Sequence, residues 1–278
     1  MLIIFRPYGN HTNQIYQFIQ GDIFAKIHNL QFDCYFVYNF FSFFPNLREK
    51  YKSFKTLFVF PVLSFIFKIL NRFHLINAFD VSDLKICQKI ADCHINDKNL
   101  IFDKWDFKGN EVLFNNKDLF KEYRDYYKEL FFIDISAIKD KYIDRKFKNI
   151  AVHIRRGDYA DFRGGKFLFD NEFYCQKTKE LLSLWNIEKA NIIIFTNDSK
   201  IDKNFFYQSF ENVCFSNEEW FIDQQLMSNC DFIIGPPSTF TMWASYIGNT
   251  PVYHIWQPNK RLLKKDFFVY TSFHPDIE

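Results

Sequence analysis

Two adjacent arginines, Arg155 and Arg156, stand between an apolar stretch and a glycine–aspartate pair in the sequence NIAVHIRRGDYADF. The alternating apolar residues at positions 150–154 predict a short buried strand, which would place both arginines at its carboxyl end. Open α/β sheets bind ligands at that edge. A guanidinium group is planar, permanently charged and able to contact two phosphate oxygens at once. This arrangement indicates a clamp for a diphosphate.

Two other interpretations of this motif remain open at this point. Asp158 could form a purely structural ion-pair cluster with Arg155 or Arg156, because such networks also occur outside active sites. His153, taken alone, is more typical of a buried, satisfied histidine than of a ligand-binding one. An adhesion-type Arg-Gly-Asp loop is disfavoured because a strand runs directly into it.

A second polar loop follows the predicted first strand, residues 2–6, and opens a helix predicted over residues 14–28. The loop contains Gly9, Asn10, His11 and Asn13. Glycine permits close backbone approach, and free N–H groups at a helix start attract anions. As a general signal this is weak, since many strand–helix turns look alike.

Two further loops end predicted strands in the second half of the chain. Asn197 and Asp198 close the strand predicted over residues 191–198, where they could hold a ribose or base edge or, more commonly, cap the next helix. Ser238, Thr239 and Phe240 follow the strand predicted over residues 231–235. Ser238 or Thr239 could cap a helix whose dipole faces a phosphate, and a role in capping alone is equally plausible.

The order of the predicted elements indicates the fold class. Beyond residue 149, helical patterns near 171–185 and 217–230 alternate with strands at 191–198, 213–215, 231–235 and 251–255. Such alternation is typical of a parallel, doubly wound sheet. The first forty residues repeat this pattern, and residues 40–145 are mostly helical and irregular. We therefore expect an α/β protein with two Rossmann-like doubly wound domains, residues 1–145 and 146–278.

Composition excludes several classes of function. The 278 residues are 48% hydrophobic with a net charge of +2, which allows a large core and gives no electrostatic basis for binding nucleic acid. Six cysteines without a C-x-x-C pair fit reduced thiols in the cytoplasm. Neither G-x-G-x-x-G, nor a P-loop, nor Asp-x-Asp, nor a zinc-type cluster occurs, so we expect arginines and helix amides, and no metal or cofactor, to neutralise a diphosphate. We find no signal peptide and no apolar run long enough to span a membrane.

The segment of residues 48–72 combines basic residues with the apolar block TLFVFPVLSFIF and a single acid, Glu49. Two core-packed helical turns with solvated flanks are one interpretation, which we favour slightly. A patch that rests on an anionic membrane face is the other.

Four blocks of the sequence resemble the α1,2-fucosyltransferase family. VHIRRGDY is similar to the H-x-R-R-x-D signature, and RPYGNHTNQIYQF to the amino-terminal G-N-Q loop and helix. IIIFTNDS resembles the strand ending in Ser-Asp-Asp, and DQQLMSNCDFIIGPPSTFTMWASYIGN the carboxyl-terminal block with its serine-rich turn. The blocks occur in the family's order and cover the first thirty residues and most of 150–255.

The resemblance implies a GT-B-type glycosyltransferase that inverts the anomeric carbon, takes GDP-fucose as donor and needs no metal. Residues 1–145 would bind the acceptor and residues 146–278 the nucleotide sugar. Arg155 would be the arginine most needed for the diphosphate, supported by Arg156 and His153, and Asp158 would orient the arginines or the guanine end. The other donor-binding candidates are Asn197, Asp198, Ser238, Thr239, Phe240, Gly9 and Asn10. His11, Asp158 or another carboxylate, whose position the sequence does not give, is the candidate for the base, and Asn13 is the candidate for positioning the acceptor.

The expected function is transfer of a sugar, most simply L-fucose, onto a hydroxyl group of a surface glycan or glycolipid. The loop GNHTNQ, in which Asn13 is the equivalent of the family asparagine, the strand end at residues 196–198 and the turn at residues 236–239 depart from the family pattern and leave another GDP-activated sugar open. A non-catalytic module that binds nucleotide sugars is the rival from another class. The expected location is the cytoplasm, with peripheral contact to the inner membrane face as an option.

Overall fold

The computed structural model describes residues 1–81, 83–92, 100–105, 113–114 and 118–271. The chain folds into two compact units, one built from Met1–Phe132 and the other from Ile133–Tyr270. Each unit contains its own parallel sheet, and each is described by itself.

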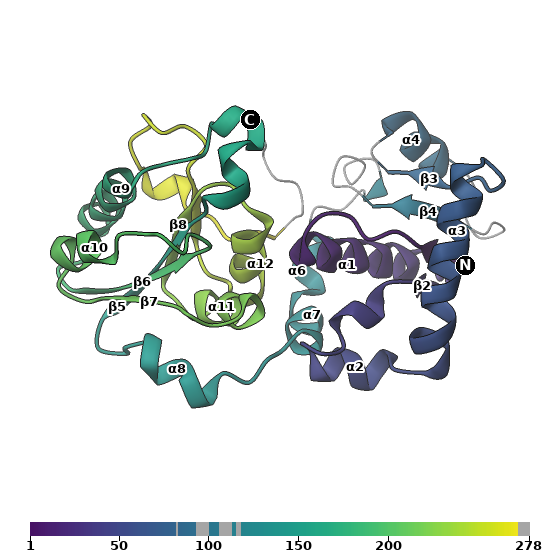
Figure 1. The fold of residues 1–278 in the computed structure, drawn as a ribbon, viewed down its shortest axis with the longest axis horizontal. Helices are drawn as coiled ribbons and strands as arrows, with labels where there is room; N and C mark the ends of the chain where they lie inside the picture. Colours follow the sequence, from purple (N-terminus) through teal and green to yellow (C-terminus); the bar gives the residue numbers. More distant parts are fainter. Residues whose placement is uncertain (82, 93–99, 106–112, 115–117, 272–278) are drawn as a thin grey trace. The chain divides into compact units, whose positions relative to one another are not determined.

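The first unit contains a four-stranded parallel sheet with the order β2-β1-β4-β3. Its strands are β1 (Leu2–Ile4), β2 (Phe32–Cys34), β3 (Phe79–Asp80) and β4 (Leu100–Lys104). Helix α1 (His11–Ile27) connects β1 to β2, as Figure 1 shows. Most residues of α1 are buried, so this helix is covered by the rest of the unit on nearly every side.

The remaining helices of this unit form a layer rich in aromatic residues. They are η1 (Val37–Phe40), α2 (Pro45–Tyr51), the π-helical η2 (Lys55–Val59), α3 (Phe60–Arg72), α4 (Leu84–Asp92), α6 (Leu119–Glu122) and α7 (Arg124–Leu130). Proline begins α2, where its missing N–H would have no helical partner anyway. Pro61 lies near the start of α3, which continues directly from η2. Phe18 of α1 packs edge-on against Tyr51 and Phe131, which joins the ends of this layer to α1.

The second unit contains a five-stranded parallel sheet with the order β7-β6-β5-β8-β9. The strands are β5 (Lys148–Ile154), β6 (Ala190–Thr196), β7 (Val213–Phe215), β8 (Phe232–Gly235) and β9 (Val252–His254). Helices α9 (Asn171–Leu184) and α10 (Lys203–Ser209) cover one face, and α11 (Trp220–Met227) and α12 (Thr239–Gly248) cover the other (Figure 1). The winding direction reverses between β5 and β8, and such a reversal is where doubly wound sheets bind ligands.

Close packing of β5 against β8 depends on one glycine. A Cβ at Gly235 would lie 2.8 Å from the carbonyl oxygen of His153 and 2.9 Å from its Cβ. The two central strands therefore approach at a position where any side chain would push them apart.

These two sheets confirm the predicted α/β class and most predicted elements of the second unit. Three expectations need correction. The middle stretch, expected to be mostly helical, also forms β3 and β4; β4 pairs with β1 on one side and with β3 on the other. Helix α1 begins at His11 and not near residue 14, so His11 and Asn13 lie on its first turn.

The third correction concerns the expected boundary at 145/146, because residues 133–145 belong to the second unit. Helix α8 (Ser136–Tyr142) is held there by polar contacts. The Tyr142 hydroxyl donates to Glu218 at 2.7 Å, and the Asn191 amide donates to the Tyr142 carbonyl at 2.6 Å. Residues 139–149 are rich in charged side chains, which indicated a boundary between domains and gave no sign of these contacts.

Candidate functional site

The turns after β5 and β8 meet at the carboxyl edge of the second sheet. Arg155 leaves the end of β5, and Ser238 follows β8 and caps α12. The Arg155 Nη1 donates to the Ser238 Oγ at 3.2 Å. This bond spans the reversal point of the sheet, so the predicted arginine clamp lies where the topology favours a ligand.

The side chain of Arg155 is fixed from two directions. Its Nε and Nη2 donate to the two carboxylate oxygens of Asp158 at 3.0 and 2.6 Å. Its guanidinium also lies over the ring of Tyr159, 4.7 Å from the centroid. Three of the five N–H groups of an arginine are thereby engaged, and two remain for a further acceptor.

Asp158 is the orienting partner in this pair. Its side chain is 54% exposed, whereas that of Arg155 is only 18% exposed. Hydrogen bonding from Arg155 lowers the pKa of Asp158 below its usual value, so the carboxylate stays charged at neutral pH. Such a carboxylate holds a cation well and accepts a proton poorly.

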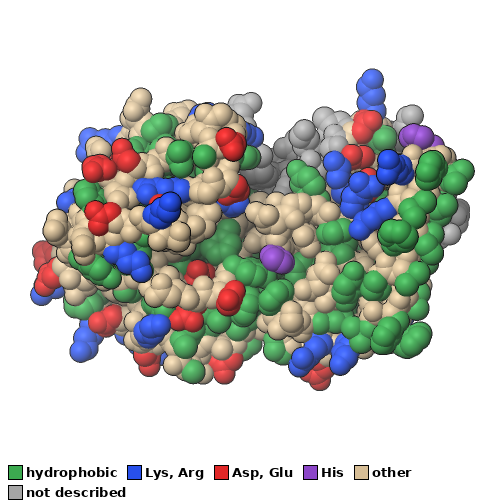
Figure 2. Space-filling model, in the orientation of Figure 1, with side chains coloured by type: hydrophobic (Ala, Val, Ile, Leu, Met, Phe, Trp, Pro, Cys, Tyr) green, Lys and Arg blue, Asp and Glu red, His purple; other side chains and the backbone are tan. Residues whose placement is uncertain are grey.

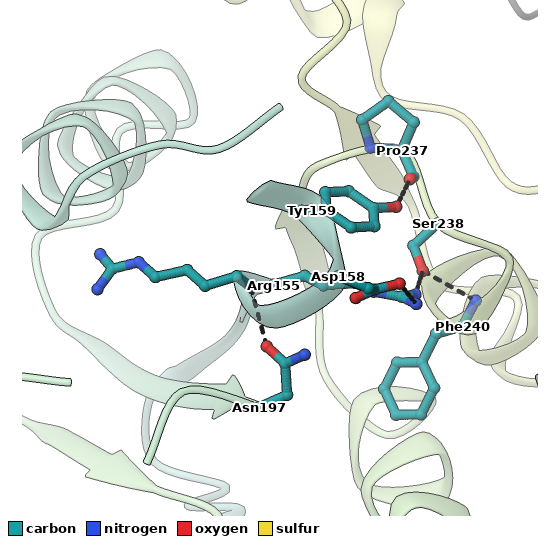
Figure 3. A network of polar contacts seen from close by, with 8 residues as sticks. Arg155, Asp158, Tyr159, Asn197, Pro237, Ser238 and Phe240 are labelled. Atoms are coloured by element: carbon teal, nitrogen blue, oxygen red, sulfur yellow. Dashed lines mark hydrogen bonds and ion pairs between the residues drawn. The ribbon is translucent and has the colours of Figure 1, made fainter. Parts of the chain in front are cut away.

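Tyr159 links the two turns at the back of this cluster. Its hydroxyl donates to the carbonyl of Pro237, and Figure 3 shows Tyr159 and Asp158 directed toward Pro237 and Ser238. Because Tyr159 is buried, this bond keeps the β5 turn in register with the β8 turn. Nothing in the sequence marks Tyr159 for this role, although it directly follows the Arg-Gly-Asp tripeptide.

Ser238 has two roles at the start of α12. Its Oγ accepts from the backbone N–H of Phe240 at 3.3 Å, which is the N-cap predicted from the sequence (Figure 3). Its carbonyl accepts from the Thr241 hydroxyl at 3.0 Å. The helix N-terminus therefore lies beside Arg155, and both contribute positive potential to the same place.

Arg156 is held by a different set of contacts. Its Nη1 donates to Asp198 at 2.8 Å, its Nη2 donates to Asn171 at the start of α9, and its backbone N–H donates to Asn197 at 2.9 Å. Both members of its ion pair are about one-fifth exposed. Arg156 thus ties the β5 turn to the β6 turn and to α9, and Asp198 neutralises its charge.

The turn after β6 is built to present Asp198. Partial burial would raise the pKa of this carboxyl, but hydrogen bonds from the Lys200 backbone N–H and from Arg156 keep it below its usual value. The Thr196 hydroxyl accepts from the Asp198 N–H at 3.1 Å. Asn171, the remaining partner of Arg156, carried no signal in the sequence because it lies 15 residues downstream on another element.

His153 lies under the site as a neutral side chain. Burial, with a contribution from Arg155 and His254, lowers its pKa to about 3. Its ring stacks near Phe240 at 5.2 Å, and its Nδ1 has no hydrogen-bond partner among the described residues. An uncharged imidazole adds no positive charge to the arginines, so any support it gives is through packing.

The candidates near the amino terminus lie on the first unit. Gly9 has a φ of +66°, and a Cβ there would meet the amide nitrogen of Asn13 at 2.2 Å. The Gln14 amide donates to the Gly9 carbonyl at 3.0 Å. Asn10 caps α1 through its backbone alone, and His11 is exposed, 5.8 Å edge-on from Phe43. This loop is a compact turn that requires its glycine.

The structure therefore brings together Arg155, Asp158 and Ser238 with Phe240 at one edge of the second unit, and Arg156, Asn197 and Asp198 beside them. Thr239 begins α12 and is half-buried there. Within the part of the chain that the structure describes, no group of three or more His, Cys, Asp or Glu side chains is arranged to hold a metal ion.

Comparison with known proteins shows the family of this chain. A sequence model described as glycosyl transferase family 11 matches residues 105–268, which is more than half of the chain. No curated protein sequence matches the chain. A solved structure of a mutant of Arabidopsis thaliana FUT1 in complex with GDP is similar over 99% of this chain and 75% of that chain, with a TM-score of 0.58 and 9% identity. This likeness confirms the expected GT-B type of fold with two Rossmann-like domains.

Proposed function

Because the chain belongs to glycosyl transferase family 11, we propose that it transfers L-fucose from GDP-fucose to a hydroxyl group of a glycan or glycolipid acceptor. The family supports a glycosyltransferase, and the GDP bound to the similar Arabidopsis protein favours a guanine nucleotide. The observation that carries the proposal is Arg155, held between Asp158 and Ser238 beside the start of α12.

In the proposed reaction, the acceptor hydroxyl attacks the anomeric carbon while the bond from that carbon to the β-phosphate oxygen breaks. Charge accumulates on the departing GDP, and the two free N–H groups of Arg155 would stabilise it. The start of α12 would add its dipole at the same place. The proposed reaction uses no divalent cation.

Asp158 acts in this mechanism as a positioning residue. Its bidentate contact fixes the Arg155 guanidinium before the donor arrives, so little reorganisation is needed during the reaction. Its lowered pKa makes it a poor base. His11 is then the remaining named candidate for the base that takes the proton of the acceptor hydroxyl, and Asn13 the candidate for positioning the acceptor. Attack from the face opposite to GDP would invert the anomeric carbon.

The test begins with calorimetric titration of the protein with GDP, UDP and CMP. We expect binding of GDP in preference to the other two, unchanged by EDTA. Release of GDP from GDP-fucose and from GDP-mannose is then measured with a panel of glycan acceptors.

Acceptor-dependent release from GDP-fucose is the expected result, and faster release from GDP-mannose would refute fucose as the donor sugar. Binding of GDP without turnover of either donor would indicate a non-catalytic module. A preference for UDP, or activity lost in EDTA and restored by manganese, would overturn the proposed donor site.

A further inference from the structure

An apolar stripe on the first unit is exposed to solvent and has no role in the proposed transfer reaction. It consists of Phe54, Phe58, Val62, Phe65, Ile69 and Phe73, along η2 and α3 and their flanking residues. Their spacing of three or four residues places them on one helical face. Each is between 40% and 74% exposed, and Ile66 and Leu75 beside the stripe are exposed as well. The exposed large apolar residues outside this segment are scattered along the chain.

The opposite face of the same helix is anchored to the sheet. The Ser64 Oγ donates to the Phe5 carbonyl at 2.7 Å, and Phe67 packs 5.6 Å from the Phe5 ring. Phe60 packs 4.8 Å from Tyr35. The core interpretation of this segment is therefore wrong for its outer face, because the protein core takes the Ser64 side and leaves the stripe in water.

Basic side chains border this stripe. The segment 45–72 contains six basic residues against the single acid Glu49. Lys55 pairs with Asp33 at 2.8 Å, but Lys68 and Arg72 form no ion pair with any described residue. Lys68 and Arg72 are four residues apart, so both lie along one edge of the stripe.

The helix lies along the protein surface. Among the described residues no single helix is long and apolar enough to cross a bilayer, although Pro45–Tyr51 and Lys55–Arg72, bent by 101°, meet the length and composition criteria together. Because one side of α3 is packed on β1 and its neighbours, lipid can reach only the other side.

We propose that this stripe docks on the surface of an anionic lipid bilayer, with the apolar side chains inserted at the acyl boundary and Lys68 and Arg72 on the headgroups. Figure 2 shows hydrophobic side chains gathered over α3, with basic side chains nearby on the same unit. Positive charge along an exposed apolar face is complementary to an anionic membrane and offers nothing to a neutral one. The site in the second unit is not involved.

The experiment is co-sedimentation of the full chain with vesicles of phosphatidylcholine, or of phosphatidylcholine with about 30% phosphatidylglycerol. We expect the protein to sediment with the anionic vesicles and to remain in solution with the neutral ones. Phe58→Ser combined with Phe65→Ser should lower binding at least about tenfold, because two inserted rings are lost. Phe132→Ser, at an exposed phenylalanine outside the stripe, is the matched control and should bind normally.

A charge-reversal pair of variants distinguishes binding to anionic lipid from nonspecific hydrophobic adsorption. Lys68→Glu with Arg72→Glu should also lower anionic binding about tenfold, whereas Lys121→Glu with Lys128→Glu, at exposed lysines of α6 and α7, should not. Thermal unfolding and GDP titration without vesicles report whether each variant is folded and whether its nucleotide site is intact. The proposal would be overturned if the parent bound both vesicle types equally or if the stripe variants bound as the parent does. It would also be overturned if the parent bound no vesicles and formed a dimer that the Phe65 change dissociates.

Discussion

Replacement of Arg155 by lysine tests the proposed donor site most directly. Lysine keeps the positive charge but has one ammonium group in place of a planar fork. It cannot contact both carboxylate oxygens of Asp158 and also reach Ser238 and a phosphate, as the geometry at 3.0, 2.6 and 3.2 Å allows for arginine. The two N–H groups assigned to the leaving diphosphate are lost.

The expected effects on activity and on stability differ in size. Loss of one preorganised donor raises a barrier by about 2.7–4 kcal/mol, which corresponds to a rate lower by roughly 10²–10³. The ion pair itself adds little to folding, because Asp158 is 54% exposed and water screens such a pair to about 1 kcal/mol or less. We therefore expect a melting temperature lower by only about 2–4 °C.

The assay measures acceptor-dependent GDP release from GDP-fucose, together with GDP affinity and thermal unfolding. Arg145→Lys, an exposed arginine before β5 at the opposite edge of the same sheet, is the matched control and should retain the parental rate. A rate for Arg155→Lys within about threefold of the parent, with a normal melting temperature, would refute the assignment of Arg155 to the leaving group.

Three further changes test the surrounding structure. Tyr159→Phe keeps the ring under Arg155 but leaves the Pro237 carbonyl without its donor. The free energy of unfolding, measured in guanidinium, should therefore fall by about 1 kcal/mol. Unchanged stability would contradict the proposed link between the turns. Gly235→Ala should lower the free energy of unfolding by about 1–3 kcal/mol and weaken GDP binding, because its Cβ would lie 2.8 Å from a backbone oxygen of β5. An alanine variant as stable as the parent would show that the strands can move apart freely. Burial raises the pKa of Asp223 to about 7, so between about pH 4 and pH 7 the folded state binds more protons than the unfolded state, and stability should fall as pH rises through that range. Asp223→Asn should remove this fall and stabilise the protein at pH 8 by at least about 1 kcal/mol, and equal pH profiles for parent and variant would contradict it.

The second unit could be predicted closely because its strands are buried on both faces. Such strands appear as continuous apolar runs, as in residues 192–195, and each is followed by a polar turn. The same pattern located Ser238 at the start of α12. By contrast, β3 is only two residues long and has no periodicity to detect, so the first sheet was predicted incompletely.

The outer face of α3 could not be predicted for another reason. Residues 54–73 are apolar on most sides, and hydrophobicity alone does not say which side the core will take. The Ser64 hydroxyl decides this, because it is buried on a backbone carbonyl of β1's neighbour Phe5. A serine within an apolar run was the weakest signal in the segment, and it marks the side that faces the protein.

The sequence also treats Arg155 and Arg156 as a pair, whereas the fold separates them. Consecutive residues at the end of a strand point to opposite faces of the sheet. Arg155 accordingly reaches Ser238 at the start of α12, and Arg156 reaches Asn171 at the start of α9, on the other face. The Arg156 guanidinium forms an ion pair with Asp198 and donates to Asn171, so its charge is paired on that face. Arg155, in contrast, is fixed by Asp158 and Tyr159 at the reversal point of the sheet, beside Ser238 at the start of α12. For that reason the chemistry is assigned to Arg155, while Arg156 holds the turn that presents it.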